Sequence, residues 1–231
     1  MQKILSIVGI EGSGHHLIHD CLSYEGQKDT RDANLELQLK LYSCDFEENN
    51  SNKILEMLRV RELNNEEFFL DNSSFPWGRP YRIVSRHDII NYYNLFEKLD
   101  YCDLHFIFLT RNIKHSTFST HRRFDKKLRL VHTAKYQEDC LLFIISQLKI
   151  LPQNKVTTLD YYDICKHPKK FETLLQNKFG HKIHFNQSKI KLTKNHTEAD
   201  SNELLNKFFT EQRLSQFSYI EDNIINLKDY A

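Results

Sequence analysis

Two kinds of hydrophobic pattern alternate along this chain. Short apolar runs rich in β-branched and aromatic residues, typical of strands, occupy residues 3–8, 81–85, 104–110 and 156–159. Between them, apolar residues recur every three or four positions, which predicts helices over 15–22, 87–99, 112–128, 133–150 and 168–178. Alternating strands and helices indicate βαβ units. We therefore expect an α/β fold of three layers, with a mostly parallel sheet covered on both faces.

The stretch from 26 to 80 is less regular. Residues 34–42 and 53–63 have weak helical periodicity, whereas the Asn- and Ser-rich segments 49–52 and 72–78 are typical of loops. We expect these insertions to rim the functional site. Because 231 residues suit one hydrophobic core, we predict a single domain over residues 1–231.

Charge and cysteine content argue against several classes of protein. The 32 Lys and Arg residues nearly balance the 31 Asp and Glu residues, so a general binder of nucleic acid or membrane surfaces is not expected. The five cysteines are widely spaced without a C-x-x-C pair, which argues against a disulfide framework or a Cys-based zinc site. Reduced thiols are typical of cytoplasmic proteins, so we expect a cytoplasmic location. The apolar run 3–10 is too short to span a bilayer, and we expect no membrane span or targeting segment.

A glycine-rich loop follows the first predicted strand. The segment Gly9-Ile-Glu-Gly-Ser-Gly14 joins that strand to a helix, where backbone N–H groups and the helix dipole form an anion-binding nest. This strand-loop-helix is P-loop-like, but His15 and His16 replace the Lys and Ser/Thr of a P-loop. The hydroxyl that holds Mg²⁺ in such loops is therefore missing. The alternative is a tight turn whose glycines serve backbone geometry alone.

A second, independent signal follows the buried strand 104–110. Arg111 comes at the carboxyl end of this strand, where open α/β sheets bind ligands, and residues 111–129 contain seven Lys or Arg and one acid. An arginine at a buried strand end needs an anion or a carboxylate partner. For Lys126, Lys127 and Arg129, the alternative of a solvated basic helix face is favoured.

Three segments together resemble the sulfotransferases that use 3′-phosphoadenosine 5′-phosphosulfate. The strand, Ser-Gly loop and helix of residues 8–22 resemble that family's 5′-phosphosulfate loop. Arg111-Asn-Ile-Lys-His-Ser-Thr-Phe-Ser119 is similar to the family's 3′-phosphate motif Arg-Asn-Pro-Lys-Asp-x-x-x-Ser, with the same spacing from Arg to Ser. Residues 159–180 resemble its Tyr-Glu-Asp-Leu, Pro, helix and Leu-Gly stretch.

The resemblance implies a role for each matched residue. Arg111 and Ser119 would bind the 3′-phosphate, by a two-oxygen guanidinium contact and a helix-borne hydroxyl. The residues around the 5′-phosphosulfate would be Gly12, Ser13, Gly14, His15 and His16. The strand ending in Arg82-Ile-Val-Ser-Arg-His87 resembles one ending in Lys-Thr-His, which indicates His87 as the catalytic base; the alternative is that His87 merely caps the strand end.

The chain also departs from the family pattern. Many members have Lys or Arg just before Ser-Gly, whereas this chain has Gly12, so another cation must stabilise the leaving phosphate. His15, His16 and Arg86 are the candidates, with His16 and Arg86 joining His87 as the proposed catalytic residues. If none reaches the site, the protein binds the nucleotide without turnover.

Two further patterns bear on cofactors. The family's late Arg-Lys-Gly segment is not found, and lysines 189, 191 and 194 offer a replacement, although a solvated lysine run is the favoured interpretation. His15 and His19 are spaced i,i+4, but no third metal ligand is evident, so we expect no metal.

The sequence thus predicts an enzyme that transfers a sulfuryl group from the nucleotide donor to a hydroxyl or amine acceptor, such as a carbohydrate or a small molecule. Two alternatives stay open. One is a nucleotide kinase or NTPase with a degraded P-loop, and the other is a non-catalytic nucleotide-binding module. The acceptor, the other expected partner, is not identified by any motif, since its pocket is expected to come from residues 26–80 and 190–231.

Overall fold

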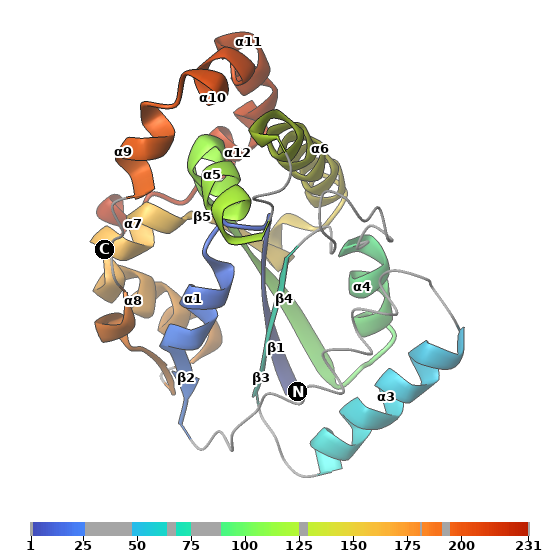
Figure 1. Cartoon of the computed structure of the whole chain (residues 1–231). Coiled ribbons are helices and arrows are strands. Elements are labelled where there is room, and N and C mark those ends of the chain that lie inside the picture. The colour runs from blue at the N-terminus through green and yellow to red at the C-terminus, as the bar shows by residue number, and fades with distance from the viewer. Residues whose placement is uncertain are drawn as a thin grey trace.

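The computed structural model describes residues 2–25, 48–63, 68–74, 89–124, 129–180, 182–190 and 195–230. Its strands are β1 (Gln2–Gly9), β2 (Leu22–Tyr24), β3 (Phe68–Ser74), β4 (Cys102–Thr110), β5 (Val156–Asp160) and β6 (Ile183–Phe185). Its helices are α1 (His15–Cys21), α3 (Glu48–Leu63), α4 (Ile89–Phe96), α5 (Ile113–Phe124), α6 (Leu130–Leu148), α7 (Tyr161–Lys166), α8 (Pro168–Phe179), α9 (Asn195–Asp200), α10 (Glu203–Phe208), α11 (Glu211–Leu214) and α12 (Ser218–Asn223), arranged as Figure 1 shows.

A four-stranded parallel sheet forms the centre of the fold. Its strand order is β3-β1-β4-β5, and every neighbouring pair runs in parallel. A smaller antiparallel pair joins β2 to β6. The predicted α/β class and the mostly parallel sheet are confirmed, and so are the strands expected near residues 3–8, 104–110 and 156–159. The strand expected at 81–85 and the helix expected at 34–42 lie outside the described residues.

Two expectations for the insertion are wrong. Residues 49–52, expected as a loop, belong to α3, and residues 72–74, also expected as a loop, belong to β3. Asn and Ser favour turns because their side chains compete for backbone hydrogen bonds. In β3 that preference is overridden by parallel pairing with β1, in which Ile7 is opposite Asn72 and Gly9 is opposite Ser74.

Helices cover both faces of the sheet. Along β4, the side chains of Leu104, Phe106 and Phe108 belong to one buried cluster, whereas Ile107 and Leu109 belong to another. Because successive residues of a strand point to opposite faces, these clusters lie on opposite sides of the sheet. The first cluster contains residues of α3, α4 and α6, and the second contains residues of α1, α7 and α8, on opposite sides of the sheet in Figure 1.

The C-terminal segment, residues 195–230, lies against β5 at the edge of the sheet. Ile225 donates its backbone N–H to the carbonyl of Thr158 over 3.0 Å, and Ile224 forms a bridge with the same residue. The helices that precede these two residues, α9 to α12, lie near α5 and α6, at the end of the sheet where its strands finish (Figure 1). This segment therefore contributes to the surroundings of the strand ends.

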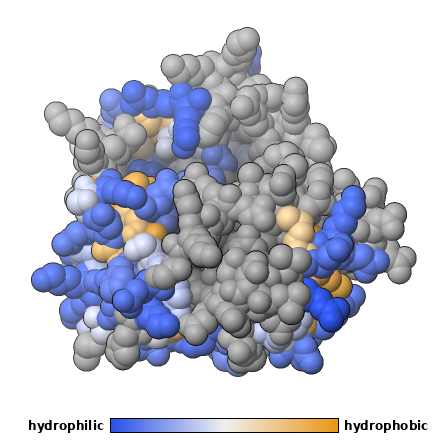
Figure 2. All heavy atoms as spheres, turned by 90° about the horizontal axis from the view of Figure 1, so that it is seen from below, coloured by the Kyte–Doolittle hydropathy of each residue, from blue (hydrophilic) through white to orange (hydrophobic). Residues whose placement is uncertain are grey.

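The opposite end of the molecule, where the central strands begin, has a different character. Seen from that side, the described surface is mostly hydrophilic, with small separated apolar patches (Figure 2). No helix within the described ranges is both long enough and apolar enough to cross a membrane.

One ion pair fastens the C-terminal segment to the core. Glu138 of α6 has a nearly buried side chain, and its carboxylate accepts a 2.8 Å hydrogen bond from Arg213 of α11. The guanidinium of Arg213 also lies over the ring of Phe208 at 4.3 Å. A buried carboxylate needs such a partner, because leaving a charge uncompensated in the interior is costly.

We therefore expect Arg213→Ala to lower the free energy of unfolding by about 1–3 kcal/mol, less than for a fully buried pair because the Arg213 side chain is 41% exposed. Urea denaturation measures this loss. The matched control is Lys135→Ala, since Lys135 lies 3.9 Å from the same carboxylate but is 58% exposed, and its loss should be below about 1 kcal/mol. Equal losses for the two variants would show that Arg213 does not carry the attachment.

Candidate functional site

The candidate site lies where the parallel strands end. The glycine loop follows β1, Arg111 follows β4, and Asp160 ends β5 immediately before Tyr161 and Tyr162 of α7. Since parallel strands present their carboxyl ends at one edge of a sheet, these segments come together there. The structure thus brings the predicted glycine loop and the predicted strand-end arginine to the same place.

The backbone of the glycine loop adopts positive φ angles, which glycine tolerates better than other residues. Gly12 and Gly14 have φ angles of 80° and 95°, in the left-handed region. Neither position has room for a side chain: a Cβ on Gly12 would collide with the carbonyl oxygen of Ser116, and a Cβ on Gly14 would lie 2.5 Å from the ring of Tyr161. The loop is therefore packed closely between α5 and α7.

Two loop residues implicated by the resemblance contact each other. The hydroxyl of Ser13 lies 2.9 Å from Nδ1 of His15, and both side chains are buried. The His15 ring is 4.2 Å from the ring of His16, which is exposed. Of the two histidines that replace the P-loop Lys and Ser/Thr, His16 is the one that faces solvent.

A glutamine of α6 fastens the loop to α5. Gln137 is fully buried, and its amide nitrogen donates to the carbonyl of Glu11 over 3.0 Å and to the hydroxyl of Thr120 over 2.9 Å. Sequence reasoning missed this residue. The available signal was a polar side chain on an otherwise apolar helix face, a position that requires hydrogen-bond partners.

Arg111 bridges the loop and α7. Its Nε donates to the hydroxyl of Tyr162 and its Nη1 donates to the carbonyl of Gly12, each over 3.0 Å. The guanidinium also lies 5.1 Å from the ring centre of Tyr161 and 5.4 Å from that of Tyr162. Two of its five N–H donors are used in these bonds, so the group retains donors for an anion.

Ser119 lies further along α5 and is half-buried. Helical periodicity places it on the same face as His115 and Arg122, four residues before and three after it. His115 contacts Asp200 at 2.8 Å and Arg122 contacts Glu198 at 2.7 Å. The face that carries Ser119 is thus the face that α9 approaches.

Burial keeps the nearby acidic groups protonated to higher pH. It raises the pKa of Tyr162 above its ordinary value, although the hydrogen bond and charge of Arg111 oppose the increase. Burial also raises the pKa of Asp160, whose carboxylate caps α7 by accepting the N–H groups of Tyr162 and Asp163. Tyr162 therefore retains its proton at neutral pH and is able to donate it in a hydrogen bond.

Four of the implicated residues, His87, Arg86, Lys191 and Lys194, lie outside the described residues. Lys189 donates to the carbonyl of Asp20 over 2.7 Å. Over the described ranges, no cluster of three or more His, Cys, Asp or Glu side chains could hold a metal ion.

A cavity of about 310 Å³ adjoins the strand ends. Six residues contribute polar groups to its wall: Thr110, Arg111, Asn112, Lys114, Asp160 and Glu221. Apolar side chains of β4, α6 and the C-terminal segment form much of the rest: Phe108, Leu141, Leu214, Phe217, Ile220 and Ile224. Such a mixture of apolar walls and a few converging polar groups is typical of small-molecule sites.

Comparisons with known proteins do not assign a family: no family model matches the chain, and no curated protein is significantly similar to it. The interpretation of the site therefore rests on the geometry described above and on the resemblance of its motifs.

The close packing of Gly12 gives a stability test. Gly12→Ala should lower the free energy of unfolding by roughly 2–5 kcal/mol, because it adds both backbone strain and a collision with Ser116. Gly180→Ala is the control: φ there is also positive, at 110°, but nothing lies within 4 Å of the added methyl, so backbone strain of about 1–3 kcal/mol acts alone. A smaller loss at Gly12 than at Gly180 would contradict the described loop.

Proposed function

We propose that this chain is a sulfotransferase that transfers a sulfuryl group from 3′-phosphoadenosine 5′-phosphosulfate to a hydroxyl or amine. The proposal includes a three-layer α/β fold with a P-loop-like strand-loop-helix at the start of the chain. The donor is a co-substrate, and no metal takes part. Cytoplasmic location and a single domain remain predictions from the sequence.

One observation carries the proposal: the guanidinium of Arg111 contacts the glycine loop at Gly12. These two segments are 99 residues apart and were implicated by independent motifs. A donor with a phosphosulfate at one end and a phosphate on its ribose needs two anion-binding groups within one molecule's reach. The contact between Arg111 and Gly12 supports the proposal because it brings these two anion-binding groups close together.

In the proposed complex, the loop N–H groups of Gly12, Gly14, His15 and His16 hold the 5′-phosphosulfate, whereas that of Ser13 donates to the carbonyl of Ile10. Arg111 and Ser119 hold the 3′-phosphate. The acceptor oxygen or nitrogen attacks sulfur in line with the bond to the leaving phosphate oxygen. His87, as the general base, removes the proton from the attacking hydroxyl or amine. The charge that develops on the leaving phosphate is stabilised by loop N–H groups together with His16 and Arg86.

The cavity beside Arg111 favours one class of acceptor. Its walls are largely apolar, and its volume of about 310 Å³ suits a small molecule. Polar residues line only part of the wall, so a sugar would place several of its many hydroxyl groups against apolar side chains, which is costly. Of the two acceptor classes expected from the sequence, a small molecule with an apolar body is therefore favoured over a carbohydrate.

A non-catalytic nucleotide-binding module is the second candidate. Ser13 and His15, two side chains of the loop, contact each other and are buried, which leaves less of the loop's side-chain chemistry for turnover. The kinase or NTPase alternative is less well supported, because His15 and His16 occupy the positions of the P-loop Lys and the Mg²⁺-binding hydroxyl.

Thermal shift separates these classes of protein. Adenosine 3′,5′-bisphosphate in EDTA should stabilise the protein, by about 2.7 kcal/mol at 100 times its dissociation constant, whereas ATP with Mg²⁺ should have little effect. Binding without turnover on any acceptor would favour the nucleotide-binding module. Strong stabilisation by ATP with Mg²⁺ and none by the bisphosphate would replace the sulfotransferase with the kinase-like alternative.

The role of Arg111 has its own test. Arg111→Ala should weaken binding of adenosine 3′,5′-bisphosphate by about 1.5–3 kcal/mol, the usual range for a charged hydrogen bond, and should hardly affect adenosine 5′-phosphate. Calorimetry with both ligands measures the difference, and Arg129→Ala, a change of an exposed basic residue, is the control. Equal losses for both ligands would place Arg111 at the 5′ end or in support of the loop.

A further inference from the structure

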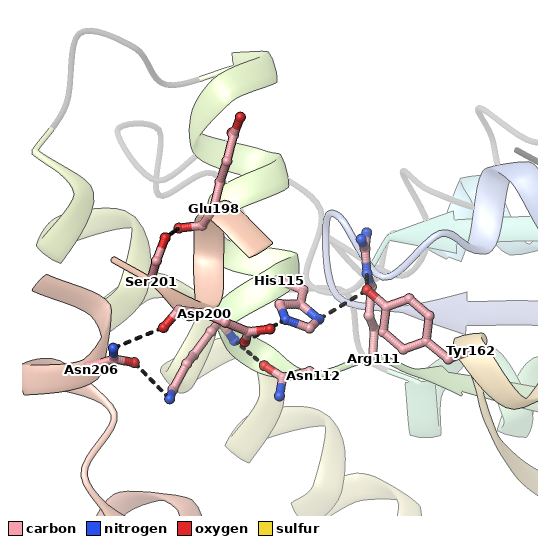
Figure 3. Close-up of polar contacts among 9 residues, drawn as sticks. Arg111, Asn112, His115, Tyr162, Glu198, Asp200, Ser201 and Asn206 are labelled. Carbon is pink, nitrogen blue, oxygen red and sulfur yellow. Dashed lines mark hydrogen bonds and ion pairs between the residues drawn. The ribbon is translucent and has the colours of Figure 1, made fainter. Parts of the chain in front are cut away.

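A continuous chain of polar contacts leads from Arg111 to the C-terminal helices (Figure 3). Arg111 Nε lies 3.0 Å from the hydroxyl of Tyr162, which lies 3.0 Å from Nδ1 of His115. Nε2 of His115 then lies 2.8 Å from Oδ1 of Asp200. The four residues come from the end of β4, from α7, from α5 and from the end of α9, so the chain joins four separate segments at one point.

The donor of each bond follows from the chemistry of the groups. A guanidinium only donates, so the Tyr162 oxygen accepts from Arg111 and its own proton is left for Nδ1 of His115. When the proton of the His115 ring is on Nε2 alone, Nδ1 accepts from Tyr162 and Nε2 donates to the Asp200 carboxylate. Tyr162 and His115 thus each accept one hydrogen bond and donate the next, between the guanidinium of Arg111, which only donates, and the carboxylate of Asp200, which only accepts.

Tyr162 is held rigidly enough to orient an arginine. Its backbone N–H is bound by the Asp160 carboxylate at 2.8 Å, and its ring meets that of His115 edge to face, with 5.7 Å between centres. His115 is itself buried. A free arginine side chain has many rotamers, whereas a bond at Nε fixes the plane of the guanidinium and so the direction of its remaining donors.

The far end of the chain is also fixed in place. Two contacts at the protein surface join α9 and α10 to α5: Arg122 with Glu198 at 2.7 Å, and Lys114 with Asn206 at 2.9 Å. Asn206 in turn donates to the backbone carbonyl of Asp200 over 3.0 Å. The position of Asp200 relative to His115 therefore depends on how α9 is seated on α5.

We propose that Tyr162, His115 and Asp200 are positioning residues that hold the guanidinium of Arg111 against the glycine loop, so that the seating of α9 controls the orientation of this arginine. That this orientation matters for binding of the nucleotide sulfate donor rests on the proposed function. The orientation of the arginine itself does not depend on that function.

The first experiment needs no ligand. In ¹⁵N NMR spectra of the full chain, the Nε–H signal of Arg111, assigned by its loss in Arg111→Lys, should exchange slowly with solvent. Tyr162→Phe keeps the ring but removes the hydroxyl, and it should accelerate this exchange by about tenfold or more. Tyr230→Phe, which removes a hydroxyl that accepts from Asn177 far along the chain, is the matched control and should leave the signal unchanged. No change in Tyr162→Phe would overturn the proposal.

The far end is tested by a pair of variants of Asp200. Asp200→Asn retains an oxygen that accepts from Nε2 of His115, whereas Asp200→Ala does not. The alanine variant should accelerate exchange of the Arg111 signal by about threefold or more and the asparagine variant should restore slow exchange. Equal exchange rates in wild type and Asp200→Ala would overturn the part of the proposal that concerns α9.

Binding of adenosine 3′,5′-bisphosphate links the network to function. Tyr162→Phe should weaken it by about 5–20-fold in the wild-type background and by less than about twofold when Arg111 is already alanine, because Tyr162 acts through Arg111. Equal weakening in both backgrounds would overturn the positioning role. If wild type does not bind the bisphosphate while the NMR results are as expected, the proposed function fails and the positioning of Arg111 stands.

Discussion

The parallel pairing of β1 with β4 is the constraint on which the candidate site depends. In this register Ile7 is opposite Ile107 and Val8 is opposite Phe108, so the two strands finish side by side. Residues a few positions beyond each end then come within hydrogen-bond distance, as Gly12 and Arg111 do. A shift of one residue would move every β4 side chain to the opposite face and would place Phe106 and Phe108 in the wrong cluster. Burial of the core thus also determines where the arginine lies.

Strands β1, β4 and β5 of the central sheet were predictable because most of their residues are buried on both faces. Such strands are apolar almost without interruption, a signal that survives in a single sequence, as Leu104 to Leu109 illustrates. The sequence of β3 reads Phe-Phe-Leu-Asp-Asn-Ser-Ser, and its polar half favours turns by local preference. Pairing with β1, a contact between residues more than 60 positions apart, decides its conformation, and no local pattern records such a contact.

For the candidate site, the sequence indicated the glycine loop and Arg111 but not the residues that hold them. Tyr161 and Tyr162 are adjacent aromatics, most simply interpreted as core residues, and only the orientation of α7 separates the ring that packs on Gly14 from the hydroxyl that binds Arg111. His115 and Asp200 are 85 residues apart, and nothing in the spacing of either one indicates the contact. Contacts of this kind come from tertiary packing, which periodicity does not report.

The packing around Gly12 gives a physical reason why no lysine or arginine occupies this position of the loop. A lysine or arginine at this position would need a Cβ where the carbonyl of Ser116 lies, and it would also have to adopt a φ of 80°. Because α5 begins directly after β4 and packs on the loop, there is no space for a basic side chain on that side. The guanidinium of Arg111 instead reaches the same residue from the end of β4, as a donor to its carbonyl. Close packing of α5 on the loop and the approach of a cation from the neighbouring strand are therefore two consequences of one arrangement, in which the loop is confined between the helices that follow β4 and β5.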